Sequence, residues 1–233
     1  MTVTALVSGG KDSLYAAFLA ETQGWPVDEL LTLRPSDPES AMFHTPNLGL
    51  VALQAEAWGK RHREAPVPSS GDADELRALR DALAGSPGPI VVGAILSSYQ
   101  WSRVVRIADE LHRRVYAPLW RKDPARVVRA EIAAGLDIRL VHLAAEPLTP
   151  DLLGRQLDPD LLAELERRGR SIRALNVAGE GGEFETLVVD APFFRSRIQF
   201  EETETVVTGS TATLTVRRAR LGPKVAPAAG GRS

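Results

Sequence analysis

The chain has 233 residues, of which 44% are hydrophobic, and this is enough to build the core of one large or two small globular domains. The formal net charge is −2 and no strongly basic block is present, so nucleic acid is an unfavoured partner. The absence of cysteine excludes disulfides, thiolate metal sites, iron–sulfur clusters and cysteine nucleophiles.

The first predicted elements are a buried strand and a helix, joined by a glycine- and serine-rich turn. Residues 3–7 are a compact apolar run, and apolar residues then recur at helical spacing. Three features of this turn favour an anionic ligand. Backbone amides at the start of a helix point toward it, Gly9 and Gly10 allow the backbone to approach it closely, and Lys11 adds a positive charge. We therefore expect phosphate or pyrophosphate here, although an ordinary strand–helix turn is the alternative. The predicted cradle is Ser8, Gly9, Gly10, Lys11, Asp12 and Ser13.

Strand-like and helix-like segments then alternate as far as residue 135. The predicted strands are 27–33, 63–68, 90–96 and 115–120, and the predicted helices are 47–59, 72–85, 98–114 and 123–135. This alternation predicts an α/β fold with a doubly wound parallel sheet, in which ligands collect at the carboxyl ends of strands. The polar loops 8–13, 35–47 and 97–100 all follow predicted strands, so we expect them to converge on one crevice.

Two of these loops carry further candidate nucleotide ligands. His44 lies in the second loop, where a lone histidine is more often structural than catalytic. Ser97, Tyr99 and Gln100 lie in the third loop, and they either cap the following helix or hydrogen-bond a base or ribose.

The pattern changes after residue 135. A strand is predicted at 136–144, one or two short helices broken at Pro159 over 149–169, a core strand from Thr186, and a hairpin that turns near Gly209. The residues from Gly222 onward are small and rich in proline and glycine, which predicts a disordered tail. No apolar run approaches the roughly 20 residues of a membrane span and no secretory signal is evident, so we expect a cytoplasmic protein without membrane association.

A glycine- and glutamate-rich segment precedes that core strand. Gly179, Gly181 and Gly182 permit a tight, exposed backbone, and three glutamates lie within six positions. Clustered carboxylates repel one another and are tolerated where a cation, an ammonium group or a proton transfer uses them. A solvated acidic turn is the alternative interpretation. The three glutamates are Glu180, Glu183 and Glu185.

Six stretches in order resemble the diphthine–ammonia ligase family of the PP-loop ATP-pyrophosphatase superfamily, from about residue 4 to about residue 220. They are SGGKDS at 8–13, MFHT at 42–45, GAILSSYQWSR at 93–103, APLW at 117–120, LLGRQLD at 152–158 and VAGEGGEFET at 177–186. The resemblance implies a HUP-type (adenine nucleotide alpha hydrolase-like) sheet over 1–135, a smaller α+β domain over 136–221 and a tail over 222–233. Asn176 is a departure, because many relatives are expected to carry histidine there.

The resemblance also implies a reaction, with ATP and Mg²⁺ as cofactors. The carboxylate of diphthine, on elongation factor 2, is adenylated with release of pyrophosphate, and ammonia then displaces AMP to give diphthamide. Catalytic roles fall on Lys11, Glu183 and Glu185, and Asp12 either orients Lys11 or holds Mg²⁺. Nucleotide ligands are expected among residues 8–13 with His44, Ser97, Tyr99 and Gln100. The substrate is expected to contact Gly179, Glu180, Gly181, Gly182, Glu183, Glu185 and Thr186.

Other functions remain open at this point. The chain can be a PP-loop ligase for another small-molecule or RNA substrate, including one similar to tRNA lysidine synthetase, although a basic RNA-binding surface is not evident. It can also be an adenine-nucleotide-binding protein without turnover. Without cysteine, glutamine hydrolysis and sulfur transfer are disfavoured, so free ammonia or a separate donor is the expected source of nitrogen. A homodimer is possible.

Overall fold

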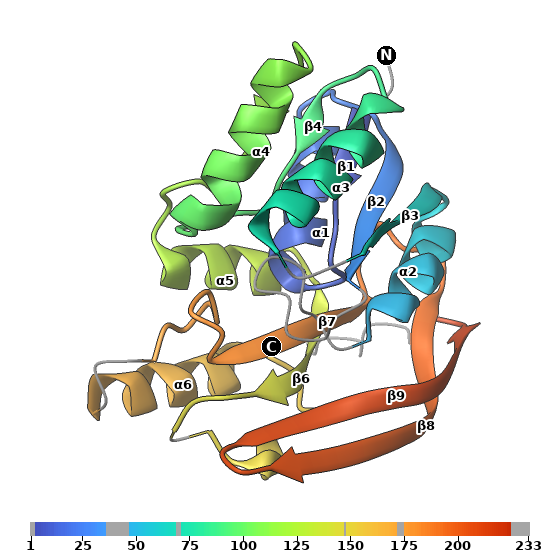
Figure 1. Ribbon diagram of the computed structural model, residues 1–233. Helices are drawn as coiled ribbons and strands as arrows, with labels where there is room; N and C mark the ends of the chain where they lie inside the picture. The colour runs from blue at the N-terminus through green and yellow to red at the C-terminus, as the bar shows by residue number, and fades with distance from the viewer. Residues whose placement is uncertain (1–2, 36–46, 69–70, 147, 172–174, 225–233) are drawn as a thin grey trace.

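The computed structural model describes residues 3–35, 47–68, 71–146, 148–171 and 175–224 (Figure 1). Two sheets build the molecule: a five-stranded sheet from the first half of the chain and a four-stranded sheet from the second half. In Figure 1 the four-stranded sheet lies beneath the five-stranded sheet and its helices. Among the described residues, no helix has both the length and the apolar character needed to cross a membrane.

The five-stranded sheet is parallel throughout, with the order β3-β2-β1-β4-β5. Its strands are β1 (Val3–Leu6), β2 (Val27–Pro35), β3 (Arg61–Val67), β4 (Ile90–Val91) and β5 (Val115–Tyr116). Its helices are α1 (Lys11–Thr22), α2 (Val51–Trp58, after a 3₁₀ turn at Leu48–Leu50), α3 (Asp72–Ala84), α4 (Ser98–Glu110) and α5 (Pro124–Ala133). The predicted doubly wound fold is confirmed.

Helices cover both faces of this sheet. Buried side chains of α1, α2 and α5 pack in one hydrophobic cluster, and those of α3 and α4 pack in another. Local signals fix the helix starts: Ser97 accepts a hydrogen bond from the Gln100 amide, and Asp123 accepts one from the Arg126 amide. The strand order reverses between β1 and β4, so their carboxyl ends border the crevice where ligands of such sheets bind.

The four-stranded sheet is antiparallel, with the order β7-β6-β9-β8. Its strands are β6 (Asp137–Leu143), β7 (Phe184–Asp190), β8 (Arg197–Thr208) and β9 (Thr211–Gly222). The connection between β6 and β7 contains a 3₁₀ turn (Pro150–Leu152) and α6 (Pro159–Ser171). The predicted hairpin is confirmed, and Gly209 takes φ +58 at its turn.

The two sheets share one core. Residues of β6 and β7 belong to the same hydrophobic cluster as those of α1, α2 and α5. The amide of Val188 on β7 donates to the carbonyl of Gly9 at 3.1 Å. The buried amide group of Gln54 donates to the carbonyls of both Gly9 (2.9 Å) and Val188 (2.7 Å). The second sheet is therefore fixed directly against the turn after β1.

Several predicted boundaries differ from the structure: the strand predicted at 115–120 ends at Tyr116, and the helix predicted at 98–114 ends at Glu110. Three further differences follow from specific local contacts. The strand predicted at 90–96 ends at Val91, because the amides of Ile95 and Leu96 donate to a carboxylate instead of a neighbouring strand. Pro159 begins α6, and Asp158 caps that helix by accepting from the amide of Leu161.

The third difference concerns the predicted tail. Gly222 is the last residue of β9, and the Lys224 ammonium donates to the Ala191 carbonyl at 2.7 Å. These two residues of the expected tail are therefore held against the second sheet. Residues 225–233 lie outside the described residues.

Candidate functional site

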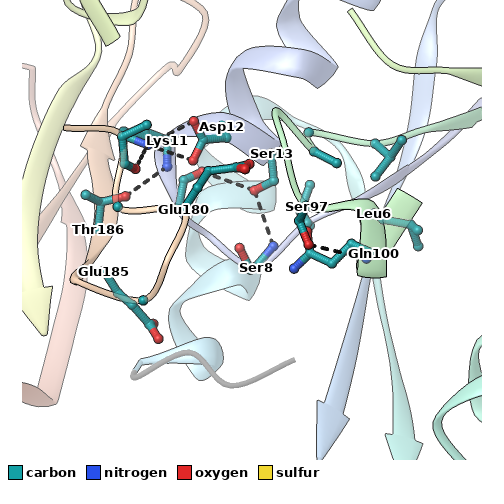
Figure 2. Close-up of a pocket in the computed structure, with 18 of the residues that line it drawn as sticks. Leu6, Ser8, Lys11, Asp12, Ser13, Ser97, Gln100, Glu180, Glu185 and Thr186 are labelled. Carbon is teal, nitrogen blue, oxygen red and sulfur yellow. Dashed lines mark hydrogen bonds and ion pairs between the residues drawn. The ribbon is translucent and has the colours of Figure 1, made fainter. Parts of the chain in front are cut away.

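A cavity of about 550 Å³ opens at the carboxyl ends of β1 and β4, a size that suits a small-molecule ligand. Both halves of the chain line it. The polar lining side chains are Ser8, Lys11, Asp12, Ser13, Ser97, Gln100, His142, Glu180, Glu185 and Thr186. Figure 2 shows that the 8–13 turn and the 178–186 segment face the same space. Loops 8–13 and 97–100 both line the cavity, as the sequence predicted, and residues 36–46 of the third predicted loop lie outside the described residues.

Lys11 is the central cation of the cavity. Its side chain is only 1% exposed, and its ammonium donates to both carboxylate oxygens of Asp12 (2.9 and 2.7 Å) and to the carbonyl of Ala178 (2.7 Å). Burial lowers the pKa of Lys11, but the charges of Asp12 and Glu131 outweigh it, and the pKa is raised above its ordinary value. Lys11 therefore stays protonated despite its burial.

The segment from Ala178 to Thr186 is anchored to the first sheet at several points. The carboxylate of Glu180 accepts hydrogen bonds from the amides of Ile95 (2.8 Å) and Leu96 (2.6 Å), just beyond β4. The hydroxyl of Thr186 accepts from the Lys11 amide at 3.2 Å. With the Lys11 contact to Ala178, these bonds place the second half of the chain directly over the start of α1.

Glycine is required at two positions around this turn. Gly9 has φ +85, in the left-handed region that favours glycine, and a Cβ there would lie 3.0 Å from the Gln54 amide oxygen. Gly93 follows β4, and a Cβ there would lie 2.7 Å from the backbone of Asp12 and Ser13. The first turn of α1 therefore packs against Gly93 without room for a side chain.

The three glutamates of the second half have different surroundings. Glu180 lines the cavity and bonds to the β4 loop. Glu183 is buried, does not line the cavity, and accepts from the amides of Asn176 (3.0 Å) and Gly181 (2.8 Å), so it shapes its own loop. Glu185 lines the cavity from β7. Of the two predicted catalytic glutamates, the structure brings only Glu185 to the cavity wall.

Some of the other predicted nucleotide ligands line the cavity and others do not. Ser8, Ser13, Ser97 and Gln100 line the cavity, and the Ser8 amide donates to the Ser13 hydroxyl at 3.3 Å. Tyr99 does not line it. His44 lies outside the described residues.

Tyr99 faces the start of α3 instead of the cavity. Its hydroxyl donates to the Asp72 carboxylate on α3 at 2.6 Å, and the guanidinium carbon of Arg103 lies 3.2 Å from the centroid of its ring. Burial and the bond to Asp72 raise the pKa of Tyr99 to about 12.

Sequence inspection missed Glu131, a buried residue of α5. Neither of its carboxyl oxygens receives a hydrogen bond from an N–H or O–H of the described residues, and the Asp12 carboxylate lies within hydrogen-bonding reach. Burial raises the pKa of Glu131 well above its usual range, the Asp12 charge raises it further, and Lys11 opposes the shift. A signal existed: Glu131 follows Val127 and Val128 at helical spacing, so it lies on the apolar face.

His142 is the second residue that sequence inspection missed. It projects from β6, lines the cavity, and is the register partner of Glu185 on β7. Its Nδ1 lies 2.7 Å from the hydroxyl of Thr213 on β9. The available signal was a single histidine within the apolar strand predicted at 136–144.

The described residues offer a limited setting for Mg²⁺. They include no cluster of three or more His, Cys, Asp or Glu that can hold a metal ion. Asp12 has a 27% exposed side chain, although both its oxygens already accept from Lys11. A magnesium ion here would therefore depend mainly on phosphate oxygens of a bound nucleotide, which is its usual mode of binding.

Comparison with known proteins identifies the family of this chain. The diphthamide synthase N-terminal domain model matches residues 1–114, and the diphthamide synthase C-terminal domain model matches residues 123–221. Diphthine–ammonia ligase of Danio rerio is 33% identical, with coverage of 89% of each chain. The proteins of that name from Rattus norvegicus and Homo sapiens are each 31% identical, covering 95% and 89% of this chain and 91% and 85% of their own lengths.

A solved structure gives a weaker likeness. It is described as a predicted subunit of tRNA methyltransferase from Methanocaldococcus jannaschii, with 16% identity, a TM-score of 0.47, and coverage of 82% of this chain and 98% of that one. Two family models that together span most of the chain, and relatives above 30% identity over nearly its full length, decide the classification. The chain belongs to the diphthamide synthase, or diphthine–ammonia ligase, family.

Proposed function

We propose that this protein is an ATP-dependent carboxylate–ammonia ligase that converts diphthine on elongation factor 2 to diphthamide, with release of AMP and pyrophosphate. The family, with its relatives named for ligation of diphthine and ammonia, supports this function. The structural observation that supports it most directly is the shared cavity, in which Lys11 of the first half contacts Ala178 of the second.

The first step joins the substrate carboxylate to the α-phosphorus of ATP. Charge accumulates on phosphate oxygens as pyrophosphate leaves, so catalysis depends on positioning and on fixed positive groups. Lys11 remains charged in its buried setting, and the first turn of α1 has no side-chain cap at Gly10. Both features suit the binding of pyrophosphate. We assign the hydroxyls of Ser8 and Ser13 to the same cradle.

The polyphosphate must share Lys11 with groups of the protein. Asp12 and the Ala178 carbonyl already accept from its ammonium. These contacts fix the direction of the side chain, so it is oriented before a nucleotide binds. We assign Asp12 this orienting role, together with an outer contact to the Mg²⁺ that accompanies ATP.

The second step replaces AMP with nitrogen. The wall formed by β6 and β7 carries Glu185 and Thr186, and we assign the acyl group and the ammonium ion to this side of the cavity. The Glu185 carboxylate suits either the ammonium ion or the trimethylammonio group of diphthine, because both are cations. Glu183 contributes by holding the 176–183 loop in shape.

Nucleotide product analysis tests the proposal. Protein, ATP, Mg²⁺ and diphthine-bearing elongation factor 2 should yield AMP and pyrophosphate in equal amounts, with the yield dependent on the factor. ADP and phosphate as products would refute the adenylation mechanism. Two outcomes would instead identify a PP-loop ligase that acts on a different substrate. In one, AMP and pyrophosphate form equally well without the factor; in the other, they form with another carboxylate alone.

A further inference from the structure

We infer that His142 is the proton acceptor that converts ammonium to ammonia for the second step, with Glu185 and Thr213 beside it on the neighbouring strands. The inference rests on the proposed ligase function and assigns within it a residue that neither the motifs nor the predicted site contained.

The three side chains form a row across three neighbouring strands. His142 on β6 is the register partner of Glu185 on β7 and of Thr213 on β9. Residues directly opposite one another in an antiparallel sheet project from the same face, with Cβ atoms about 5 Å apart. His142 and Glu185 also both line the cavity. His142 and Glu185 are therefore part of the cavity wall, and Thr213 lies beside His142 on the next strand.

Thr213 holds the Nδ1 side of the imidazole, and we assign the Nδ1–H as the donor in this contact. Its hydroxyl lies 2.7 Å from Nδ1 of His142. With a proton on Nδ1 donated to that oxygen, neutral histidine carries its lone pair on Nε2. A neighbouring Glu185 carboxylate stabilises the imidazolium that forms when Nε2 takes a proton, since opposite charges favour each other.

The chemistry requires such a group. Ammonium has no lone pair and cannot attack a carbonyl carbon. One N–H bond of ammonium breaks and its proton moves to Nε2 of His142, which leaves ammonia and an imidazolium. The nitrogen of ammonia then forms a bond to the carbonyl carbon of the acyl adenylate. The C–O bond to AMP breaks with its electron pair on the AMP oxygen, and a second proton leaves the new amide nitrogen to solvent.

His142→Asn tests this role, because asparagine keeps a donor near the position of Nδ1 and removes the second ring nitrogen. Three rates are measured with diphthine-bearing elongation factor 2: ATP–pyrophosphate exchange, amide formation from ammonium, and hydroxamate formation from hydroxylamine. Hydroxylamine is largely unprotonated near neutral pH, so it does not need the base. We expect unchanged exchange, loss of amide formation by about 10²-fold or more, and hydroxamate formation close to wild type.

His62→Asn is the matched control. His62 is also a half-buried strand histidine, with Nε2 3.1 Å from the Thr32 hydroxyl, but it does not line the cavity. This variant should keep all three rates. Thr213→Val supplies a second variant in case His142→Asn does not fold, and it should slow the ammonium reaction while sparing the hydroxylamine reaction.

The outcomes are distinguishable. Equal losses with ammonium and hydroxylamine, a loss of exchange in folded His142→Asn, or no loss at all would overturn the role of His142 while leaving the ligase function intact. A wild-type protein that shows no exchange with the factor would refute the proposed function, and the inference with it.

Discussion

The ammonium nitrogen of Lys11 lies 2.7 Å from the carbonyl oxygen of Ala178, although the two residues are separated by 167 positions in the sequence. This bond joins the turn after the first strand to the glycine-rich segment before β7. Residues of both segments line one cavity, which carries the proposed phosphate-binding side and the proposed acyl side. A separation of these two regions on different faces would have ruled out ligation at a common site.

Lys11→Met should abolish pyrophosphate release, because it removes the buried charge of the cradle. It should also lower the free energy of unfolding by about 3 kcal/mol, since Asp12 loses the cation that pairs with it. Pyrophosphate assays and urea denaturation measure the two effects. In the double variant Lys11→Met/Asp12→Asn, stability should recover while activity stays absent. Recovery of activity with stability would mean that Lys11 is only structural.

The two glutamates flanking Phe184 should behave differently. Glu185→Gln should leave ATP–pyrophosphate exchange in place and slow amide formation by about 10²-fold, because Glu185 lines the cavity on the side that we propose for the acyl group. Glu183→Gln should slow both steps together, since this carboxylate holds the loop that contacts Lys11. Steady-state rates of exchange and amidation decide the matter. Selective loss of amidation in Glu183→Gln alone would reverse the assignment.

Gly93→Ala should disturb the side of the cavity that we propose for the nucleotide. The new Cβ would lie 2.7 Å from the backbone of Asp12 and Ser13, which cannot move without shifting the start of α1. We expect a loss of about 1–3 kcal/mol in stability, as for other overpacked sites, and weaker ATP binding by calorimetry. Gly85→Ala is the control, because nothing lies within 4 Å of its Cβ position. Equal ATP binding by both variants would contradict the packing described.

Glu29 should contribute to stability in a pH-dependent manner. Burial raises the pKa of Glu29, but hydrogen bonds from Arg63 and Ser86 and the charge of Arg63 outweigh it, and the pKa is lowered. The stabilisation is therefore fully present at pH values above the ordinary pKa of glutamate, and it is lost as the pH falls through the lowered pKa of Glu29 in the folded protein. Glu29→Gln should lower the free energy of unfolding by about 2 kcal/mol near neutral pH, which lies between the contributions of exposed and buried ion pairs. It should also weaken the fall of stability with decreasing pH in the acid range.

The control for that prediction is Glu64→Gln. The pair of Glu64 with Arg34 is more exposed, with side chains 34% and 47% exposed, so its loss should cost less than about 1 kcal/mol. Urea denaturation across the acid range compares the two variants. If the free energy of unfolding of Glu29→Gln fell with decreasing pH as steeply as that of the wild type, other carboxylates would control acid unfolding.

Much of the fold was predictable from sequence because it depends on local periodicity. The alternation of apolar strands and amphipathic helices gave the parallel sheet, and the 8–13 turn with the 177–186 segment gave the two sides of the cavity. The division between domains at residue 135 stays a prediction.

The roles of single residues were less accessible, because they depend on contacts between distant elements. Glu183 and Glu185 are two positions apart, yet only one lines the cavity. His142 becomes a candidate only when the register with Glu185 is known. Glu131 and Gln54 lie on apolar helix faces, and the Asp12 and Gly9 groups that they approach come from another part of the chain.

Transfer of isotopically labelled nitrogen from ammonium to elongation factor 2 tests the central claim most directly. Wild-type protein with ATP and the diphthine-bearing factor should place one labelled nitrogen in the factor, detected by mass spectrometry of the modified peptide, and Lys11→Met/Asp12→Asn should place none. Label incorporated without ATP, or retained in that folded double variant, would contradict a single cavity that both activates the carboxylate and aminates it.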